Sequence, residues 1–353
     1  MAFLAGKIVL AVEAGAPNNG AGDGTTGRVK KTRIRGRDYP YVSAQAFRRW
    51  LRDTMTAAGS VPSPTERVGK AQGKAQKATT AADPIQYVDD DLFGYMKATA
   101  RSDDAATTVR DSPFMVGTFL AVEPARLTED FGVMSRNISD PVLHAHEFYT
   151  ADLAAPFLLD VPRVGTFTLQ AANGSGRANY LDEKTALAVA SAVQAGATTQ
   201  TFRDHTAVRL PLAPRRERVA VLFEGLAELA GGAKKALHYG DRVPALLVMV
   251  PMAGGVNPLG FVIDGAADGT GLQVRGDVLR GELAAWQGEW EPPVLVGWRP
   301  GFRDVLRKQF EADLAEEITA GTVVIDHPRT VLLALAARVR SGQHDAWFDD
   351  PAR

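Results

Sequence analysis

The sequence contains no cysteine among its 353 residues. Disulfide bonds, thiol nucleophiles and zinc sites with cysteine ligands are therefore excluded. The sequence also lacks a run of apolar residues long enough to cross a bilayer, about 18 or more, so we expect no membrane-spanning helix. The segment from Met1 to Val12 has neither a basic start nor a cleavage site typical of a secretory signal. Together these absences predict a soluble, cytoplasmic protein.

Net charge is also almost absent, because 40 Lys and Arg residues are balanced by 41 Asp and Glu residues. One stretch departs from this balance. Between Arg28 and Arg52, nine residues are Lys or Arg, and Asp38 is the sole acidic residue. A local basic stretch in a neutral chain indicates a polyanion partner, since contact with phosphates releases condensed counterions. The alternative interpretation is an ordinary solvated basic face.

The first half of the basic stretch alternates in character. Every second residue from Lys31 to Arg37 is Lys or Arg, and an extended chain would place these four side chains on one face. Pro40 then disfavours a helical conformation at Tyr39. The pattern therefore predicts an extended segment that presents cations on one side.

The second half of the stretch has the spacing of an amphipathic helix. Ser43 is a suitable N-cap for a helix of roughly three turns. Two groups of residues recur at helical spacing and define opposite sides of that helix. The polar side holds Gln45, Arg48, Arg49 and Arg52, and the apolar side holds Phe47, Trp50, Leu51 and Met55. Guanidinium groups suit bidentate phosphate binding, so the polar side is a candidate phosphate-binding surface.

Other motifs with chemical potential are weaker. The glycine-rich loop from Glu13 to Gly27 does not end in the Gly-Lys-Ser/Thr of a P-loop. Asp89 to Asp91 could suggest a metal site, but three adjacent carboxylates do not share a face, and we interpret them as the acidic start of a short helix from Leu92 to Ala98. His144 and His146 lie on one face of a strand, which leaves acid–base catalysis as an alternative.

The order of the remaining elements indicates an α+β fold. Apolar and alternating runs predict strands, and Ala-rich or amphipathic runs predict helices. Expected strands are 3–12, 114–122, 157–170 (as strand, turn and strand), 201–212 and 243–251. Besides the helix of roughly three turns after Ser43, helices before residue 250 are expected at 92–98, 182–194 and 215–230. Ala57 to Ala82, rich in Gly, Ser, Pro, Lys and Ala, is expected to be a mobile surface loop. The order fits a β-α-β-β-α-β, RRM-like (ferredoxin-like) palm with large insertions.

The last hundred residues look different from the palm. Strand-like runs are expected at 261–264 and 294–298, and helices at 277–286, 303–318 and 329–340. We expect residues 261–353 to be an extension that packs on a palm formed by residues 1–260.

Several segments in order resemble the CRISPR-associated RAMP backbone subunits that coat guide RNA in type I surveillance complexes, most closely the DevR-like branch of type I-B systems. The resemblance spans about residues 3 to 250, and VSxQAxRR and DLFGYM are its most specific motifs. The matching segments are YVSAQAFRRWLRD after the basic segment, DLFGYM at Asp91–Met96, PFLLDVPRVGTF at Pro156–Phe167, GGAK at Gly231–Lys234 and PALLV at Pro244–Val248.

The resemblance implies a fold, a function and partners. It implies a finger-like insertion at 57–110 and a thumb β-hairpin at about 123–150 that reaches toward the next subunit. The implied partners are CRISPR RNA, the target DNA strand paired to the guide, further copies of the chain and other subunits of the complex. No membrane, cofactor or metal is implied. Together with the basic stretch, it assigns RNA binding to Lys30, Lys31, Arg33, Arg35, Ser43, Gln45, Arg48, Arg49, Arg52, Arg136, Asn137, His144, Lys234 and Lys235.

The resulting hypothesis is a non-catalytic subunit that polymerises along CRISPR RNA. A coat along a variable guide must use phosphate and shape contacts, and the sheet lacks the aromatic signature with which true RRM domains stack bases. Two alternatives remain open. One is an RNA-cleaving RAMP-type ribonuclease that uses Asp89 to Asp91 or the histidine pair. The other, weaker one is a DNA-binding regulator, for which no helix-turn-helix pattern is visible.

Overall fold

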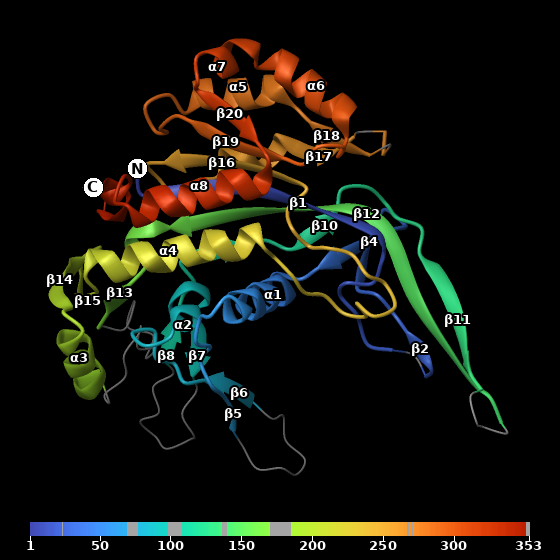
Figure 1. Ribbon diagram of the computed structural model, residues 1–353, viewed down its shortest axis with the longest axis horizontal. Helices are drawn as coiled ribbons and strands as arrows, with labels where there is room; N and C mark the ends of the chain where they lie inside the picture. Colours follow the sequence, from blue (N-terminus) through green and yellow to red (C-terminus); the bar gives the residue numbers. More distant parts are fainter. Residues whose placement is uncertain are drawn as a thin grey trace.

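The computed structural model describes residues 1–22, 24–68, 77–97, 108–135, 140–169, 185–266, 268–269 and 271–350. In these residues eleven strands form one mixed sheet, with helices on both of its faces (Figure 1). The path through the sheet runs β20 (Val323–Asp326), β19 (Val294–Trp298), β16 (Leu246–Met252), β1 (Phe3–Gly15), β12 (Val142–Asp160), β10 (Phe119–Ala121), β4 (Arg37–Val42) and β3 (Lys31–Ile34).

The N-terminal strand β1 forms the middle of this sheet. It pairs antiparallel with β12, where Leu4 lies opposite Leu159, and with β16, where Leu4 lies opposite Pro251. Both neighbours cover its edges, and most of its side chains are buried, which explains its nearly continuous apolar sequence. The prediction of a central strand at 3–12 is confirmed.

The strands β16, β1, β12 and β10 give the architecture of the palm. They are adjacent in that order and antiparallel throughout. Helix α1 (Ala44–Ala57) follows β1, and helix α4 (Leu212–Ala227) lies between β12 and β16 in sequence. This is the strand order of a β-α-β-β-α-β unit, with α1 and α4 on the same face of the sheet (Figure 1). The expected α+β, ferredoxin-like palm with insertions is confirmed.

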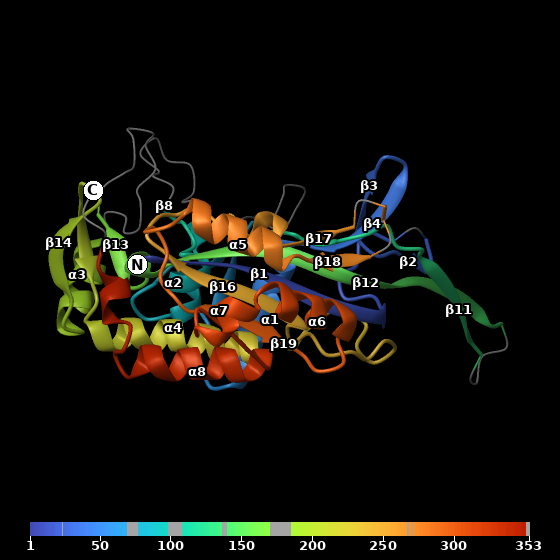
Figure 2. The same cartoon turned by 90° about the horizontal axis from the view of Figure 1, so that it is seen from above.

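The face that carries α1 and α4 holds the larger core. Phe47 and Leu51 of α1, with Phe223 and Leu226 of α4, are fully buried against the sheet. Helix α8 (Pro328–Arg340) from the C-terminal region packs beside α4 in the same core (Figures 1 and 2). The apolar stripe predicted on α8 is buried as expected.

Among the described residues, the opposite face is covered by elements of the C-terminal region. Its elements are η3 (Pro258–Phe261), β17 (Ile263–Gly265), β18 (Leu272–Val274), α5 (Gly276–Ala285), α6 (Asp304–Asp313) and α7 (Ala315–Thr319). Trp298 and Phe310 are fully buried there. Strand β19 pairs with β16 and β20 pairs with β19, so residues after 260 also extend the main sheet.

Several local predictions between residues 57 and 122 are wrong. Instead of a surface loop alone, the described part of 57–82 contains a hairpin of β5 (Thr65–Val68) and β6 (Lys77–Thr80). The helix expected at 92–98 is α2 (Val88–Phe93); Gly94, at a φ of 68°, ends it, and β7 (Tyr95–Lys97) follows and pairs with β8 (Thr108–Arg110). The strand expected at 114–122 is interrupted into β9 (Phe114–Val116) and β10.

A smaller sheet lies at one end of the molecule. It is formed by β13 (Thr166–Thr168), β15 (His205–Arg209) and β14 (Thr198–Phe202), and α3 (Thr185–Gln194) packs on it. The single strand expected at 201–212 is wrong, because Arg203 and Asp204 both have positive φ and form a two-residue turn between β14 and β15. Short 3₁₀ turns η1 (Val161–Arg163) and η4 (Asp345–Phe348) flank this end.

The other end of the molecule carries a long projecting hairpin (Figures 1 and 2). Its strands are β11 (Thr128–Met134) and the first part of β12, paired from Thr128 opposite Phe148 to Met134 opposite Val142. Near its base, β2 (Thr26–Gly27) pairs with β12. None of the helices in the described residues is long and apolar enough to span a membrane.

Candidate nucleic-acid interface

Helix α1 begins where the sequence predicted. The Ala46 N–H donates to Ser43 Oγ at 3.3 Å, so Ser43 is the N-cap. The apolar side is buried as expected, with Phe47 against Phe119 at a ring-centroid distance of 4.4 Å. This packing fixes the opposite side of α1 on the protein surface. Gln45 is exposed there.

The three arginines of α1 have different surroundings. Arg49 is 72% exposed and forms an ion pair of 2.9 Å with Asp53, one turn later. Arg52 is half-buried, lies 3.4 Å from the buried Asp89 carboxylate and stacks over the Phe93 ring. Arg52 is thus the less accessible of the two, because its charge is paired with a buried carboxylate, whereas Arg49 pairs at the surface.

Arg48 is half-buried in the wall of a cavity of about 400 Å³, beside Arg163 and Met115. Its Nε is buried and has no hydrogen-bond partner within the described chain. Burial, and then the charge of Arg52, lower the pKa of Arg48. An anion bound in this cavity could accept a hydrogen bond from Arg48 Nε, which has no acceptor in the described chain.

The alternating cations do not form one face. Strands β3 and β4 form a hairpin whose two-residue turn is Arg35-Gly36, both at positive φ. Because directly opposite residues point to the same side, Arg33 shares a face with its partner Asp38, whereas Arg37 lies on the other. The single-face prediction is thus wrong, since the turn reverses the strand in the middle of the pattern.

The tip of this hairpin nevertheless concentrates positive charge. Arg33, Arg35 and Arg37 are all exposed there. Asp38 pairs with Lys31 at 3.3 Å and with Arg33 at 3.2 Å. Burial would raise the pKa of Asp38, but the two neighbouring cations lower it overall. The single carboxylate of Asp38 does not balance these three arginines and Lys31, so the tip carries a net positive charge.

Glu147 joins the basic segment to the projecting hairpin. Its carboxylate is buried at the base of that hairpin. It accepts hydrogen bonds from the Val29 N–H at 3.0 Å and from Arg28 Nη1 at 3.1 Å, and Lys31 Nζ lies 3.6 Å away. The Lys30 backbone N–H donates to the Asn18 carbonyl, which holds Lys30 in place. The basic segment is therefore fixed in place against β12.

Two lysines predicted for RNA binding lie in the segment after α4, and they face different places. Lys234 Nζ lies directly over Gly27, so close that a Cβ added to this glycine would be 2.7 Å from it. This ammonium group therefore packs on the backbone next to the start of the basic stretch. Lys235 instead lines a cavity of about 380 Å³ beside Asp53 at the end of α1. The structure therefore brings Lys234, but not Lys235, to the base of the hairpin.

The two histidines predicted from β12 also differ. His144 is exposed and lies opposite Gly132. His146 is buried, with its ring 4.8 Å from that of His238 and its Nε2 3.6 Å from Asp130. Burial, followed by the nearby charge of Lys234, lowers the pKa of His146. Arg136 and Asn137, also predicted to bind RNA, lie outside the described residues.

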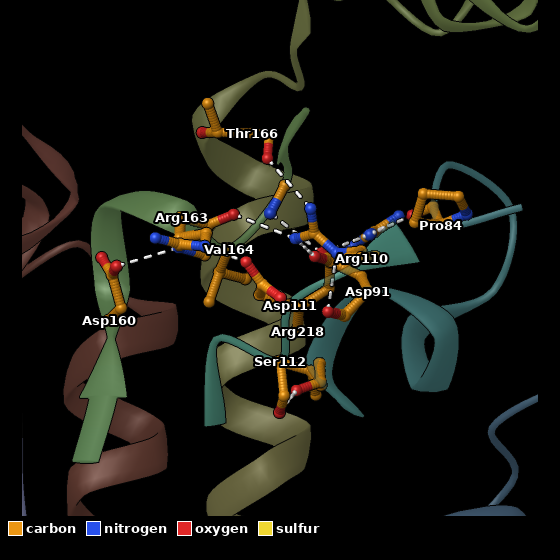
Figure 3. A network of polar contacts seen from close by, with 12 residues as sticks. Pro84, Asp91, Arg110, Asp111, Ser112, Asp160, Arg163, Val164, Thr166 and Arg218 are labelled. Carbon is orange, nitrogen blue, oxygen red and sulfur yellow. Dashed lines mark hydrogen bonds and ion pairs between the residues drawn. The ribbon is translucent and has the colours of Figure 1, made fainter. Parts of the chain in front are cut away.

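The three adjacent aspartates each serve the fold. Asp91 is fully buried, accepts from Arg110 and Gly165 N, and pairs with Arg218 at 2.5 Å (Figure 3). These contacts tie α2 to β8, to the turn after η1 and to α4. A carboxylate so enclosed has no free oxygen for a metal ion.

Asp89 and Asp90 are enclosed in a similar way. Asp89 accepts from the Ser63 N–H at 3.1 Å, and Asp90 accepts from Ser63 Oγ at 2.8 Å and from Asp83 N at 3.0 Å. Burial raises the pKa of Asp90. Across the residues that the structure describes, no group of three or more His, Asp or Glu side chains is arranged to hold a metal ion.

The projecting hairpin carries apolar side chains that no other described residue of the chain covers. Five of them are more than half exposed, and they lie on both strands. They are Phe131, Val133, Met134, Val142 and Leu143. Because large apolar side chains gathered on a protrusion mark an interaction site, this hairpin is the most evident docking surface of the described chain.

Sequence reasoning missed several residues of this region. Arg28 shares Glu147 with Lys31, the His238 N–H donates to the Lys234 carbonyl, and Arg242 lies against the backbone of Gly15 and Gly232. Arg28 was counted in the basic stretch but not assigned a site. No periodic pattern distinguishes His238 or Arg242, because they occur in an irregular segment whose position depends on tertiary contacts such as Ala233 N to Pro17 O.

Two solved structures share this fold over almost their whole lengths. One is a chain of a "CRISPR RNA-guided surveillance complex, pre-nicking", with a TM-score of 0.54 and 12% identity; the match covers 96% of this chain and 100% of that chain. The other is a chain of a "CRISPR RNA-guided surveillance complex", with a TM-score of 0.52, 13% identity and coverage of 95% and 98%. No known family profile matches the sequence, and no curated protein is similar to it in sequence.

Proposed function

We propose that this chain is a backbone subunit of a CRISPR surveillance complex and that it coats guide RNA without cutting it. The observation that carries the proposal is the end-to-end match with chains of such complexes, which includes both the palm and its insertions. The positive surfaces at the base of the projecting hairpin and at the β3–β4 tip support it. We further propose the type I-B, DevR-like branch, on the sequence motifs alone.

The chemistry of these surfaces suits a guide of any sequence. Contacts from lysine ammonium and arginine guanidinium groups to phosphate carry no information about the bases. The exposed cations Arg33, Arg35, Arg37 and Arg49 come from the β3–β4 hairpin and α1. A guide held by its backbone keeps its base edges free, and this would let it pair with a target DNA strand.

Coating also requires contact between copies. A guide is many times longer than one palm, so successive copies must touch head to tail, a heterologous contact that extends into a helix. The exposed apolar side chains of the β11–β12 hairpin are suited to such a contact. In this proposal the hairpin acts as the thumb and reaches toward the neighbouring copy.

We propose that the chain does not cleave RNA. The aspartates that would serve a ribonuclease are enclosed by Arg110, Arg218 and Ser63. Labelled RNA incubated with the protein, with and without magnesium, should therefore remain intact while a complex forms. Cleavage that co-purifies with the wild-type protein and is lost on His146→Ala would contradict this part of the proposal.

The function is tested by the RNA that the protein carries. The chain should be purified together with the products of neighbouring genes from cells that transcribe a repeat–spacer array, and the bound RNA sequenced. We expect unit-length repeat–spacer RNA. Bulk cellular RNA in proportion to its abundance, or no RNA, would overturn the proposal.

A further inference from the structure

A cleft of about 700 Å³ lies where the palm meets the C-terminal region. Its walls are the end of β1, the segment at 239–245 and the turn that follows β19 at 299–302. Three kinds of side chain line it: the carboxylates of Glu13 and Asp241, the guanidinium groups of Arg242 and Arg299, and the rings of Tyr239 and Phe302. A volume of this order accommodates a nucleotide-sized ligand.

Arg242 is an unusual wall residue, because it is 2% exposed and forms no ion pair in the described chain. Its Nη1 donates to the Asp241 carbonyl at 2.7 Å, but Nε and Nη2 have no hydrogen-bond partner. The guanidinium lies against the backbone of Gly15, Gly232 and Gly240. A buried cation with unpaired nitrogens is costly, and Nε and Nη2 of Arg242 could donate to an anion on this wall.

The rim of the cleft is held rigidly. Arg299 Nη1 donates to both carboxylate oxygens of Asp241, at 3.0 and 3.2 Å. The turn is fixed by Trp298 Nε1, which donates to the Phe302 carbonyl at 2.7 Å, and by Arg303, which pairs with the buried Asp152 at 2.8 Å. Asp241 is thereby paired with Arg299, while Arg242 and Glu13 place opposite charges on different walls of the cleft.

Tyr239 is the most exposed of the large apolar and aromatic side chains in the described residues, at 83%. A tyrosine so free of packing contributes little to the core, and its ring is available to a ligand that enters the cleft. Aromatic rings beside arginine are the usual platform for unpaired nucleobases, because every base has a face that can stack.

We propose that this cleft binds one unpaired, phosphorylated nucleotide, with its base stacked on Tyr239 and its phosphate directed to the arginine side. Glu13 on the β1 wall offers a carboxylate that can accept from a ribose hydroxyl. The nucleotide has two sources of the same chemistry, a residue of a bound RNA strand or a free mononucleotide. The first of these rests on the proposed function.

The position of the cleft favours a residue of a bound strand. The segment that supplies Tyr239 and Arg242 also carries Lys234, which packs on Gly27 at the base of the projecting hairpin. His238, one residue before Tyr239, stacks near His146 and Phe148 of β12. One short segment of protein therefore supplies both a cation at the base of the hairpin and two residues of the cleft. An RNA strand bound along that base would pass close to the cleft.

The test uses single-stranded RNA that carries one 2-aminopurine, moved through successive positions. At the position that occupies the cleft, stacking should change its fluorescence on binding; Tyr239→Ala should abolish the change, and Tyr239→Phe should keep it. Tyr239→Ala combined with Arg299→Ala should weaken RNA binding roughly tenfold, within the range seen when stacking side chains are removed. The matched control combines Val305→Ala and Arg307→Ala, which lie on α6.

A parallel titration uses 2-aminopurine riboside 5′-monophosphate alone. If the mononucleotide binds to wild type but not to Tyr239→Ala, and no RNA position gives a signal, the cleft binds free nucleotides. Equal RNA affinity and equal fluorescence in Tyr239→Ala and wild type, together with no binding of the mononucleotide, would overturn the inference. If wild type binds no RNA, the proposed function fails, and the mononucleotide titration alone decides on the cleft.

Discussion

Arg28 donates a 3.1 Å hydrogen bond to Glu147, a residue 119 positions later, and so fastens the basic segment to the base of the projecting hairpin. The same carboxylate accepts from the Val29 backbone at 3.0 Å. Two features that are separate in sequence, the cations and the hairpin, thereby form one surface. The geometry explains how the basic stretch that follows a glycine-rich loop can present its charges in a fixed direction.

Removal of this anchor should destabilise the fold. In Glu147→Ala the buried Val29 N–H loses its acceptor, which should lower the free energy of unfolding by about 1–3 kcal/mol. Glu147→Gln can still accept from Val29 and should lose less. Urea unfolding measures both, with Glu129→Ala, an exposed position on β11, as the control. Equal midpoints for Glu147→Ala and Glu129→Ala would contradict the anchoring role.

The exposed tip of the β3–β4 hairpin should govern the salt dependence of RNA binding. Replacement of Arg33, Arg35 and Arg37 with Ala should weaken binding equally for RNAs of unrelated sequence. The slope of log affinity against log salt should become shallower by about 0.7 for each lost contact. Replacement of Arg280, Lys308 and Arg329, which are exposed on α5, α6 and α8, should leave the slope unchanged. An unaltered slope in the first variant would place the RNA elsewhere.

The apolar side chains of the projecting hairpin should act in assembly and not in folding. Phe131→Asp combined with Leu143→Asp should change the unfolding midpoint little, since both side chains are largely exposed. The variant should bind short RNA but fail to form multi-copy complexes on long RNA in analytical ultracentrifugation. Val305→Asp, at a residue that is 81% exposed on α6, is the matched control. Normal assembly by the hairpin variant would show that copies meet through another surface.

Stability should fall in mild acid because of His146. Burial keeps its pKa in the folded protein below its ordinary value, which is about 6.5 in an unfolded chain. Below that pH the unfolded chain binds more protons than the folded one, so the free energy of unfolding decreases as pH falls and is constant above. His146→Gln should reduce this dependence between about pH 7 and 5. His344, whose pKa burial also lowers, should account for part of what remains. Identical pH profiles of wild type and variant would contradict the assignment.

The sequence was informative where local physics decides the structure. The apolar run of β1, the Ser43 cap and the two sides of α1 follow from periodicity and hydrogen bonding within a few residues. The order of these elements fits a β-α-β-β-α-β palm, although long insertions separate them.

The sequence was misleading where the position of a side chain depends on a turn or on a partner distant in sequence. Arg35-Gly36 reverses the chain, so alternation did not mean one face. Arg52 meets Asp89 from a different element, and no local pattern indicates this pairing. The segment after α4 is irregular, so its cleft residues Tyr239 and Arg242 become visible only in three dimensions.

If copies of this chain line up along a guide RNA, native mass spectrometry of the purified protein on unrelated single-stranded RNAs of increasing length should show it. We expect the number of copies per RNA to rise in regular steps with length, whatever the sequence, and the RNA to remain intact. A single copy on every RNA, whatever its length, would show that the copies do not line up.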